Sequence, residues 1–107
     1  MRCLLLLLAF CVAPLAPARA ETVEVKYIGS TNLDHYECDI VTRSSLINRL
    51  CYNAAARSVV VQLRETYYAY CNVPDDVVAN WFAAESMGRF YNQSIRSDAV
   101  DGRFACD

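Results

Sequence analysis

The sequence predicts a small α+β domain: a three- to four-stranded antiparallel sheet with one interrupted helix packed on one face, and two disulfides. Three observations support this fold class. Apolar and β-branched segments of strand length follow one another with short connections. An apolar stripe of helical spacing follows Pro74. Four cysteines are spread over residues 21–107, a segment too short to build a large core without covalent links.

Residues 1–20 are typical of a secretory signal peptide and are set apart from the fold. Arg2 precedes an apolar run from Leu4 to Leu15, and the segment closes on the tripeptide A-R-A at 18–20. A charged start, a short apolar middle and small residues before the cleavage point mark such a leader. The apolar run, about a dozen residues, is too short to span a bilayer. We therefore expect an exported protein, periplasmic by default or extracellular.

Export would also change the cysteine count and the charge. Cys3 and Cys11 leave with the leader, and the even number that remains in a short exported chain predicts two disulfides. The remaining cysteines are Cys38, Cys51, Cys71 and Cys106. Without Arg2 and Arg19, eight basic and twelve acidic residues are left, a net charge of −4 with His35 neutral. Such an acidic surface disfavours nucleic acid and anionic membranes as partners.

Four segments are predicted as strands. In the first, Val23, Val25 and Tyr27 alternate with polar residues, which predicts a half-buried strand at an edge of the sheet. Residues 32–43 have no convincing period and are predicted as a loop. Short connections between the later strands favour an antiparallel meander. The predicted strands are 22–28, 45–52, 59–63 and 67–73.

The helical part is predicted to begin at Pro74. Proline suits the first helical position, and the two aspartates that follow favour the positive end of the helix dipole. The apolar stripe of this helix comprises Val77, Val78, Trp81, Phe82 and Ala84. Ser86 is expected to cap a second short helix over 89–96. A polar tail follows, which Cys106 is expected to anchor.

From residue 44 to residue 96 the chain resembles the KTSC domain, a family named for its occurrence at the C-terminus of some lysyl-tRNA synthetases. The motifs that carry the resemblance are S-S-L-I at 44–47, Y-A-Y at 68–70, V-P at 73–74, A-E-S-M-G-R-F-Y-N at 84–92 and I-R at 95–96. The four cysteines make the chain similar to a secreted bacterial branch of the family. The synthetase fusion implies a role in RNA binding, whereas cysteines at 51 and 71 depart from the cytoplasmic pattern and indicate a fold adapted to an oxidising space.

The resemblance divides the chain into four parts. They are a signal peptide (1–20), an N-terminal extension with an edge strand and a loop (21–43), the KTSC-like domain (44–96) and a tail anchored by a cysteine (97–107).

In a simple meander the two strands that contain Cys51 and Cys71 are separated by a third strand. The two cysteines are then two strand spacings apart, about 9–10 Å, which is too far for a disulfide. We therefore expect Cys38 to pair with one of these two cysteines and Cys106 with the other.

The candidate binding residues are Tyr68, Tyr70, Arg49 and Arg89. Tyr68 and Tyr70 share one strand face, where they either stack on a ligand or pack beneath the helix with their hydroxyls at the rim. Core packing is the favoured interpretation. Nucleic-acid binding would require Arg49, Arg89 and Arg96 to converge near these tyrosines.

We expect a binding or interaction module without enzymatic activity, metal or cofactor, acting on an unknown protein or small-molecule partner. Single-stranded nucleic acid, RNA above all, is the first alternative. An envelope enzyme or an enzyme inhibitor is the second. A deep polar cleft that holds His35 beside the carboxylates of Asp34, Glu37 and Asp39 would favour the enzyme, and a rigid exposed loop over 29–43 would favour the inhibitor.

Overall fold

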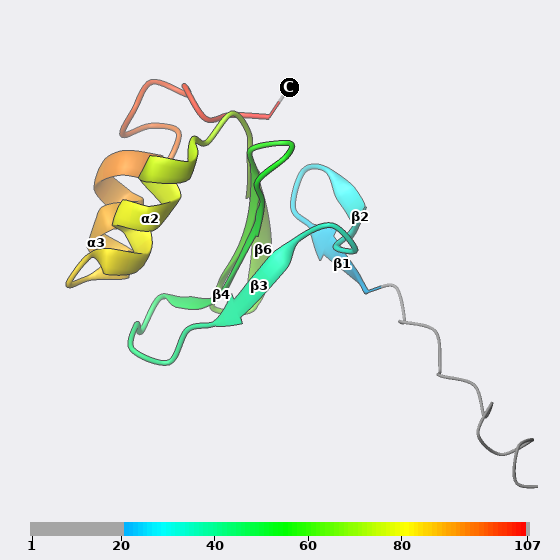
Figure 1. The fold of residues 1–107 in the computed structure, drawn as a ribbon, viewed down its shortest axis with the longest axis horizontal. Helices are drawn as coiled ribbons and strands as arrows, with labels where there is room; N and C mark the ends of the chain where they lie inside the picture. The colour runs from blue at the N-terminus through cyan, green and yellow to red at the C-terminus, as the bar shows by residue number, and fades with distance from the viewer. Residues whose placement is uncertain (1–20, 107) are drawn as a thin grey trace, which may run out of the picture.

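One six-stranded sheet carries a helical layer on one face in the computed structural model, which describes residues 21–106 (Figure 1). The predicted signal peptide, residues 1–20, lies outside the described residues. The strand order is β2-β1-β6-β5-β4-β3. All neighbours pair antiparallel except β1 and β6, which are parallel. The α+β class is therefore confirmed, while the expected count of three or four strands is too low.

The centre of the sheet is the predicted meander. It comprises β4 (Ile47–Asn53), β5 (Ser58–Leu63) and β6 (Thr66–Tyr70), which are neighbours in chain order. Three consecutive valines of β5, Val59 to Val61, are fully buried, because both faces of the sheet are covered at this strand. β-branched side chains favour the extended backbone of such a strand.

The sheet gains its extra strands from the N-terminal extension. β1 (Thr22–Val25) and β2 (Gly29–Asn32) form a hairpin, and β3 (Glu37–Ile40) pairs with β4. The predicted strand over 22–28 is thus too long, because the chain turns at Tyr27, whose φ is +72°. Its edge position is also wrong, since β2 lies outside β1.

The predicted loop over 32–43 is wrong in part, because it contains β3. The side chains of β3 carry little hydrophobic periodicity, since this edge strand buries none of its residues. Its pairing is fixed covalently instead: Cys38 stands directly opposite Cys51 of β4 in the strand register, and the two form a disulfide. A rigid exposed loop over 29–43 was the feature that would favour the inhibitor alternative, and this segment contains two strands, β2 and β3.

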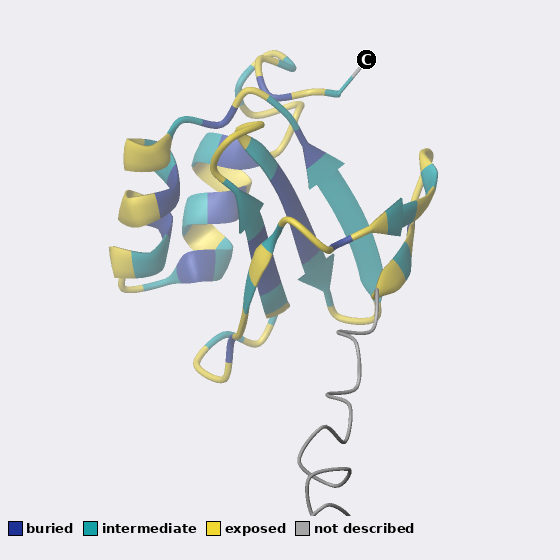
Figure 2. Ribbon diagram, turned by 45° about the vertical axis from the view of Figure 1, so that its right-hand side comes forward, coloured by how far each residue is buried: buried dark blue, intermediate teal, exposed yellow. Residues whose placement is uncertain are grey.

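Each face of the sheet has its own hydrophobic core. The buried residues of these cores lie along the central strands and in the helices (Figure 2). The larger core lies under the helices and contains Ile47, Leu50, Val59, Val61 and Trp81. The smaller core lies on the opposite face, where the extension contributes Val25 and Leu33 and the meander contributes Cys51 and Val60. The extension therefore covers apolar surface that the central strands alone would leave exposed to water.

The helical layer consists of α2 (Asp75–Ala83), α3 (Met87–Phe90) and the π-helix η1 (Tyr91–Ile95). Pro74 is the N-cap of α2 rather than its first helical residue. The Ser86 side chain accepts a hydrogen bond from the Arg89 N–H, which confirms the predicted cap. The predicted second helix over 89–96 begins earlier and changes to π geometry at Tyr91.

Trp81 holds the helical layer together. Its side chain is fully buried, and its indole N–H donates to the carbonyl of Met87 at 3.1 Å. The indole also stacks on Phe90 and on Tyr91, with ring centroids 6.1 Å apart in both pairs. One residue of α2 thus fixes the positions of both α3 and η1.

Arg43 supplies a cation at the C-terminal end of α2, whose last turn has no basic residue. Its guanidinium donates to the carbonyls of Phe82 and Ala84, at 2.5 and 3.0 Å. Carbonyls at a helix C-terminus lack intrahelical partners and carry partial negative charge. Arg43 therefore connects the segment before β4 with the end of the helix.

The second disulfide joins Cys71 to Cys106 and holds the C-terminal tail against the end of β6. The Cys71 N–H also donates to the carbonyl of Phe104, a buried residue of the tail. The expectation that Cys38 and Cys106 each pair with one of the two central cysteines is confirmed. In the part of the chain that the structure describes, no helix combines the length and apolar character needed to cross a bilayer.

Candidate binding cleft

Three tyrosines, an asparagine and an arginine line a cleft of about 570 Å³ between the end of β6 and the π-helix. Tyr68 and Tyr70 come from β6, and Tyr91 and Asn92 come from η1. Arg96 follows η1 directly. We call these five residues and the space between them the tyrosine cleft. All five belong to the motifs quoted for the KTSC resemblance.

Tyr70 and Tyr91 form the floor of the tyrosine cleft. Tyr70 is 7 % exposed and Tyr91 is 5 % exposed. Their hydroxyls are hydrogen-bonded to each other, and their rings meet edge to face at a centroid distance of 5.9 Å. Burial raises the pKa of both phenols above the ordinary tyrosine value. Tyr70 is thus a core residue with its hydroxyl paired, as the core-packing interpretation requires, while Tyr68 is only partly buried.

We expect the two hydroxyls to depend on each other. Tyr70→Phe or Tyr91→Phe alone leaves a buried hydroxyl without its partner, which should lower the free energy of unfolding by about 1–3 kcal/mol. The double variant removes both polar groups and should cost less than the two single changes combined. Urea titration of the four proteins gives this comparison. Strictly additive effects would contradict the pairing.

Alkaline pH should destabilise the protein through the same pair. The folded protein keeps both phenolic protons at pH values where the unfolded chain has lost them, because the folded pKa values are raised above 10. The free energy of unfolding should therefore be unaffected at neutral pH and fall as the pH rises above about 10. The double variant Tyr70→Phe/Tyr91→Phe should lose less over the same interval. Urea midpoints measured against pH test this, and equal slopes would contradict it.

The π-helix determines how the polar side of the cleft is built. Its defining bond runs from the Arg96 N–H to the Tyr91 carbonyl at 2.9 Å, one residue longer than an α-helical bond. The Arg96 side chain donates to the Asn92 amide oxygen at 3.2 Å and pairs with Asp98. Single π-turns are rare and occur frequently at functional sites. The hydrogen bond between Asn92 and Arg96 therefore connects two polar residues of the cleft lining.

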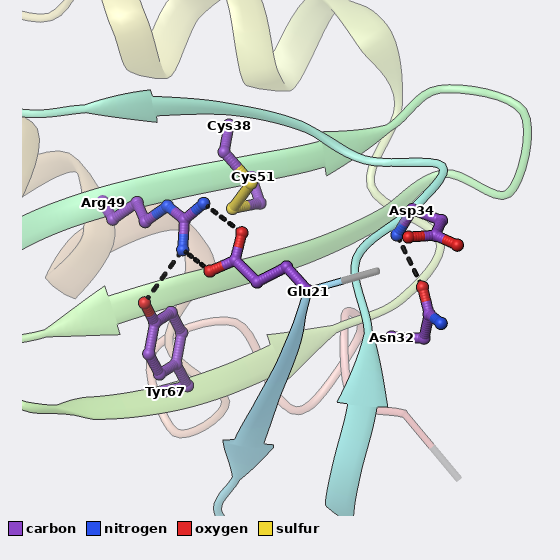
Figure 3. Close-up of a disulfide and its surroundings, with 7 residues drawn as sticks. All are labelled: Glu21, Asn32, Asp34, Cys38, Arg49, Cys51 and Tyr67. Carbon is purple, nitrogen blue, oxygen red and sulfur yellow. Dashed lines mark hydrogen bonds and ion pairs between the residues drawn. A yellow bond between two sulfur atoms is a disulfide. The ribbon is translucent and has the colours of Figure 1, made fainter. Parts of the chain in front are cut away.

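The predicted arginines do not gather at this cleft. Arg49 lies on the opposite face of the sheet, where it binds both carboxylate oxygens of Glu21 and donates to the hydroxyl of Tyr67 (Figure 3). Hydrogen bonding to Arg49 lowers the pKa of Glu21. Arg89 is exposed on α3 and is absent from the cleft lining. Of the three arginines that nucleic-acid binding would require near Tyr68 and Tyr70, only Arg96 is there.

A second cation that the sequence analysis missed, Lys26, also lines the cleft. Lys26 follows β1 and lines the cleft together with Tyr27 and Ile28 of the hairpin turn. Its ammonium lies 5.4 Å from the centroid of the Tyr27 ring. No residue pattern points from Lys26 to Arg96, which is distant in sequence. Asn92 and Arg96, by contrast, stand four residues apart within the family motif, a spacing that could have indicated their contact.

The acidic cluster lies elsewhere. His35, Glu37 and Asp39 line a separate depression of about 710 Å³ between β3 and α2, and all three are exposed. Within residues 21–106 no group of three histidine, cysteine, aspartate or glutamate side chains is placed to hold a metal ion. Asp34 is absent from the lining of this depression, and its backbone N–H donates to the side-chain oxygen of Asn32.

The comparisons with known proteins agree with these motifs. A family model described as the KTSC domain matches residues 43–98. This match covers more than half of the chain. The chain belongs to the KTSC domain family. The match begins at Arg43, the residue that binds the end of α2, and ends just beyond Arg96. A search of curated proteins gives no match.

The crystal structure of a KTSC domain protein from Yersinia pestis is similar to this chain. The two share 32 % sequence identity, and the superposition has a TM-score of 0.54. It covers 57 % of this chain and 86 % of the Yersinia protein. The KTSC domain of the present chain therefore carries additions, and β1 to β3 precede all of the residues that the family model matches.

Proposed function

We propose that this KTSC domain protein is an exported, disulfide-stabilised binding module that holds its ligand in the tyrosine cleft. The observation that carries the proposal is the convergence of motif residues from β6 and η1 on one concave site. A concave surface with an apolar floor and a few converging polar groups is the usual form of a ligand site. Tyr68, Asn92 and Arg96 would contact the ligand, while Tyr70 and Tyr91 hold the floor rigid.

Export is supported by the two disulfides and by the leader-like residues 1–20. Disulfides persist in oxidising compartments and are rare in the cytosol. Each bridge joins an addition to the KTSC domain: Cys38 belongs to the N-terminal extension, and Cys106 belongs to the tail. Both additions would be adaptations of a cytoplasmic type of domain to the cell envelope.

The rival functions have less support. A nucleic-acid site would have two cations in the cleft, Lys26 and Arg96, and Arg96 is already paired with Asp98. The net charge of −4 after leader removal also opposes binding to phosphate backbones. An enzyme would use His35 with the carboxylates of Glu37 and Asp39, which are exposed in a depression away from the family motifs. A binding module needs neither a row of cations for phosphates nor a histidine placed beside carboxylates.

Photocrosslinking from within the cleft tests the proposal. A photoreactive residue is placed at Ser97, which is exposed and lines the cleft. The matched control carries the same residue at Gln93, which is exposed on η1 but absent from the lining. In cells of a bacterium with an outer membrane, we expect a defined adduct from position 97 and none from position 93. Equal labelling from both positions, or no adduct from 97, would contradict ligand binding in the cleft.

A further inference from the structure

The edge of β6 that faces β1 is covered at its two ends but not in its middle. At one end the Lys26 N–H donates to the Tyr67 carbonyl, and at the other the Cys71 N–H donates to the Phe104 carbonyl. Residues of a strand alternate in the direction of their backbone groups. Ala69, midway between Tyr67 and Cys71, therefore directs its N–H and C=O toward the same edge, into the gap between the β1 turn and the C-terminal tail.

The length of this gap limits what can enter it. Tyr67 and Cys71 are four residues apart, which corresponds to about 13 Å of extended strand. The hairpin turn at Tyr27 blocks one end, and the tail, held by the disulfide at Cys106, blocks the other. A long strand cannot pass through, so the gap admits the end of a chain, about two residues long.

Cavities open from the gap on both faces of the sheet. The tyrosine cleft lies on the helical face, and a cavity of about 470 Å³ that includes Tyr36, Ser58 and Val60 lies on the opposite face. Ala69, Ile28 and Cys106 line both cavities. Successive side chains of an extended peptide point to opposite faces. Two cavities on either side of one strand edge therefore match consecutive side chains of a peptide that pairs with Ala69.

The charge of the gap favours a carboxylate. The cavity on the helical face is lined by two cationic side chains, Lys26 and Arg96, and by no acidic one. Arg96 binds Asp98 through its Nε, outside the lining, so Lys26 is the cleft cation that has no ion pair within residues 21–106. The exported chain as a whole is acidic, with a net charge of −4 that includes these two cations. The cavity on the opposite face is lined by neutral residues only. The chain end that suits this arrangement is a carboxyl terminus rather than an amino terminus.

We propose that the gap at Ala69 binds the carboxyl-terminal residues of a peptide in extended conformation, by strand addition to β6. The peptide backbone pairs with the N–H and C=O of Ala69, and its terminal carboxylate reaches Lys26 and Arg96. Its neutral side chain enters the cavity beside Val60. Strand addition supplies affinity through backbone hydrogen bonds and specificity through alternate pockets. The inference rests on the proposed binding function and names the ligand class of that cleft.

Backbone amide shifts in NMR spectra of the oxidised protein test this inference. The probes are a pool of N-acetylated tetrapeptides with free carboxyl termini and the same pool with amidated termini, both titrated into the millimolar range. We expect the free-carboxyl pool to move the amide signals of Ala69 and of Lys26 to Ile28. The amidated pool should bind at least about tenfold more weakly, because it lacks the charge-assisted contacts. No shift, or equal shifts from both pools, would overturn the inference.

Two variants complete the test. Lys26→Gln should weaken binding of the free-carboxyl pool about two- to fivefold, since Lys26 is an exposed partner. Arg89→Gln removes an exposed cation outside the cleft and should leave binding unchanged. A single-stranded oligothymidine titrated in parallel separates the possible failures. If it moves the cleft signals while the peptides do not, peptide binding is refuted and the binding function of the cleft stands.

Discussion

Replacing Trp81 with alanine is expected to unfold the protein or bring it close to unfolding. The indole is fully buried, donates to Met87 and stacks on two aromatic rings of the following helices. Loss of a buried tryptophan costs about 3–5 kcal/mol through lost apolar contacts and the cavity that remains. A small domain has a total stability of about 5 kcal/mol or slightly more. The variant therefore loses most of the free energy that keeps the domain folded.

Urea unfolding followed by circular dichroism measures this effect. Phe82→Ala is the matched control, because Phe82 is the next residue of α2 but is only partly buried. We expect the Trp81→Ala midpoint to be far lower than the Phe82→Ala midpoint. The near-ultraviolet signal of the tyrosines should also weaken, since Trp81 positions η1 above β6. Equal midpoints would show that Trp81 does not hold the helical layer.

Loss of the Cys71–Cys106 disulfide is expected to have an effect of similar size. The bridge joins residues 35 apart in sequence, and a closed loop of this length constrains the unfolded chain by about 4 kcal/mol. Cys38–Cys51 joins residues 13 apart and should contribute about 3 kcal/mol. Pairwise replacement by alanine avoids a free thiol in each case.

The two bridges should also differ in what they hold. Removing Cys71–Cys106 should release the tail and widen the tyrosine cleft, because Cys106 lines it. Removing Cys38–Cys51 should loosen β3, which lies at the edge of the sheet opposite β2. Hydrogen exchange of the folded variants distinguishes these outcomes. Unchanged unfolding midpoints for both double-alanine variants would contradict a structural role for the disulfides.

The elements that the sequence predicted well are those with strong local signals. The run Val59 to Val61 indicated a central strand, and Ser86 indicated a helix cap. The order of the meander excluded a bond between Cys51 and Cys71 through strand spacing, and the structure decides between the two pairings that this left open. Tyr70 as a core residue followed from the need of the apolar helix stripe for a partner surface.

The elements that the sequence predicted poorly depend on contacts between residues that are distant in sequence. β3 has acidic residues at alternate positions, Glu37 and Asp39, and buries none of its residues. Its sequence therefore has no apolar period that would indicate a strand. The π-helix arises where Tyr91 must meet Tyr70 and Trp81 at once, a requirement that appears only after packing. The cleft was missed for the same reason: Lys26 and Arg96 are 70 residues apart in sequence, and they line the same cleft because β1 pairs with β6.

Intact mass spectrometry of the protein recovered from the cell envelope tests the central claim most directly. The full chain is produced in a bacterium with an outer membrane, the cells are fractionated, and free thiols are alkylated before analysis. The account predicts envelope protein that begins at Glu21, carries no alkyl group and weighs four hydrogens less than the reduced chain, as two disulfides require. Protein found in the cytoplasm with residues 1–20 attached and its thiols alkylated would contradict the account of an exported, disulfide-stabilised KTSC module.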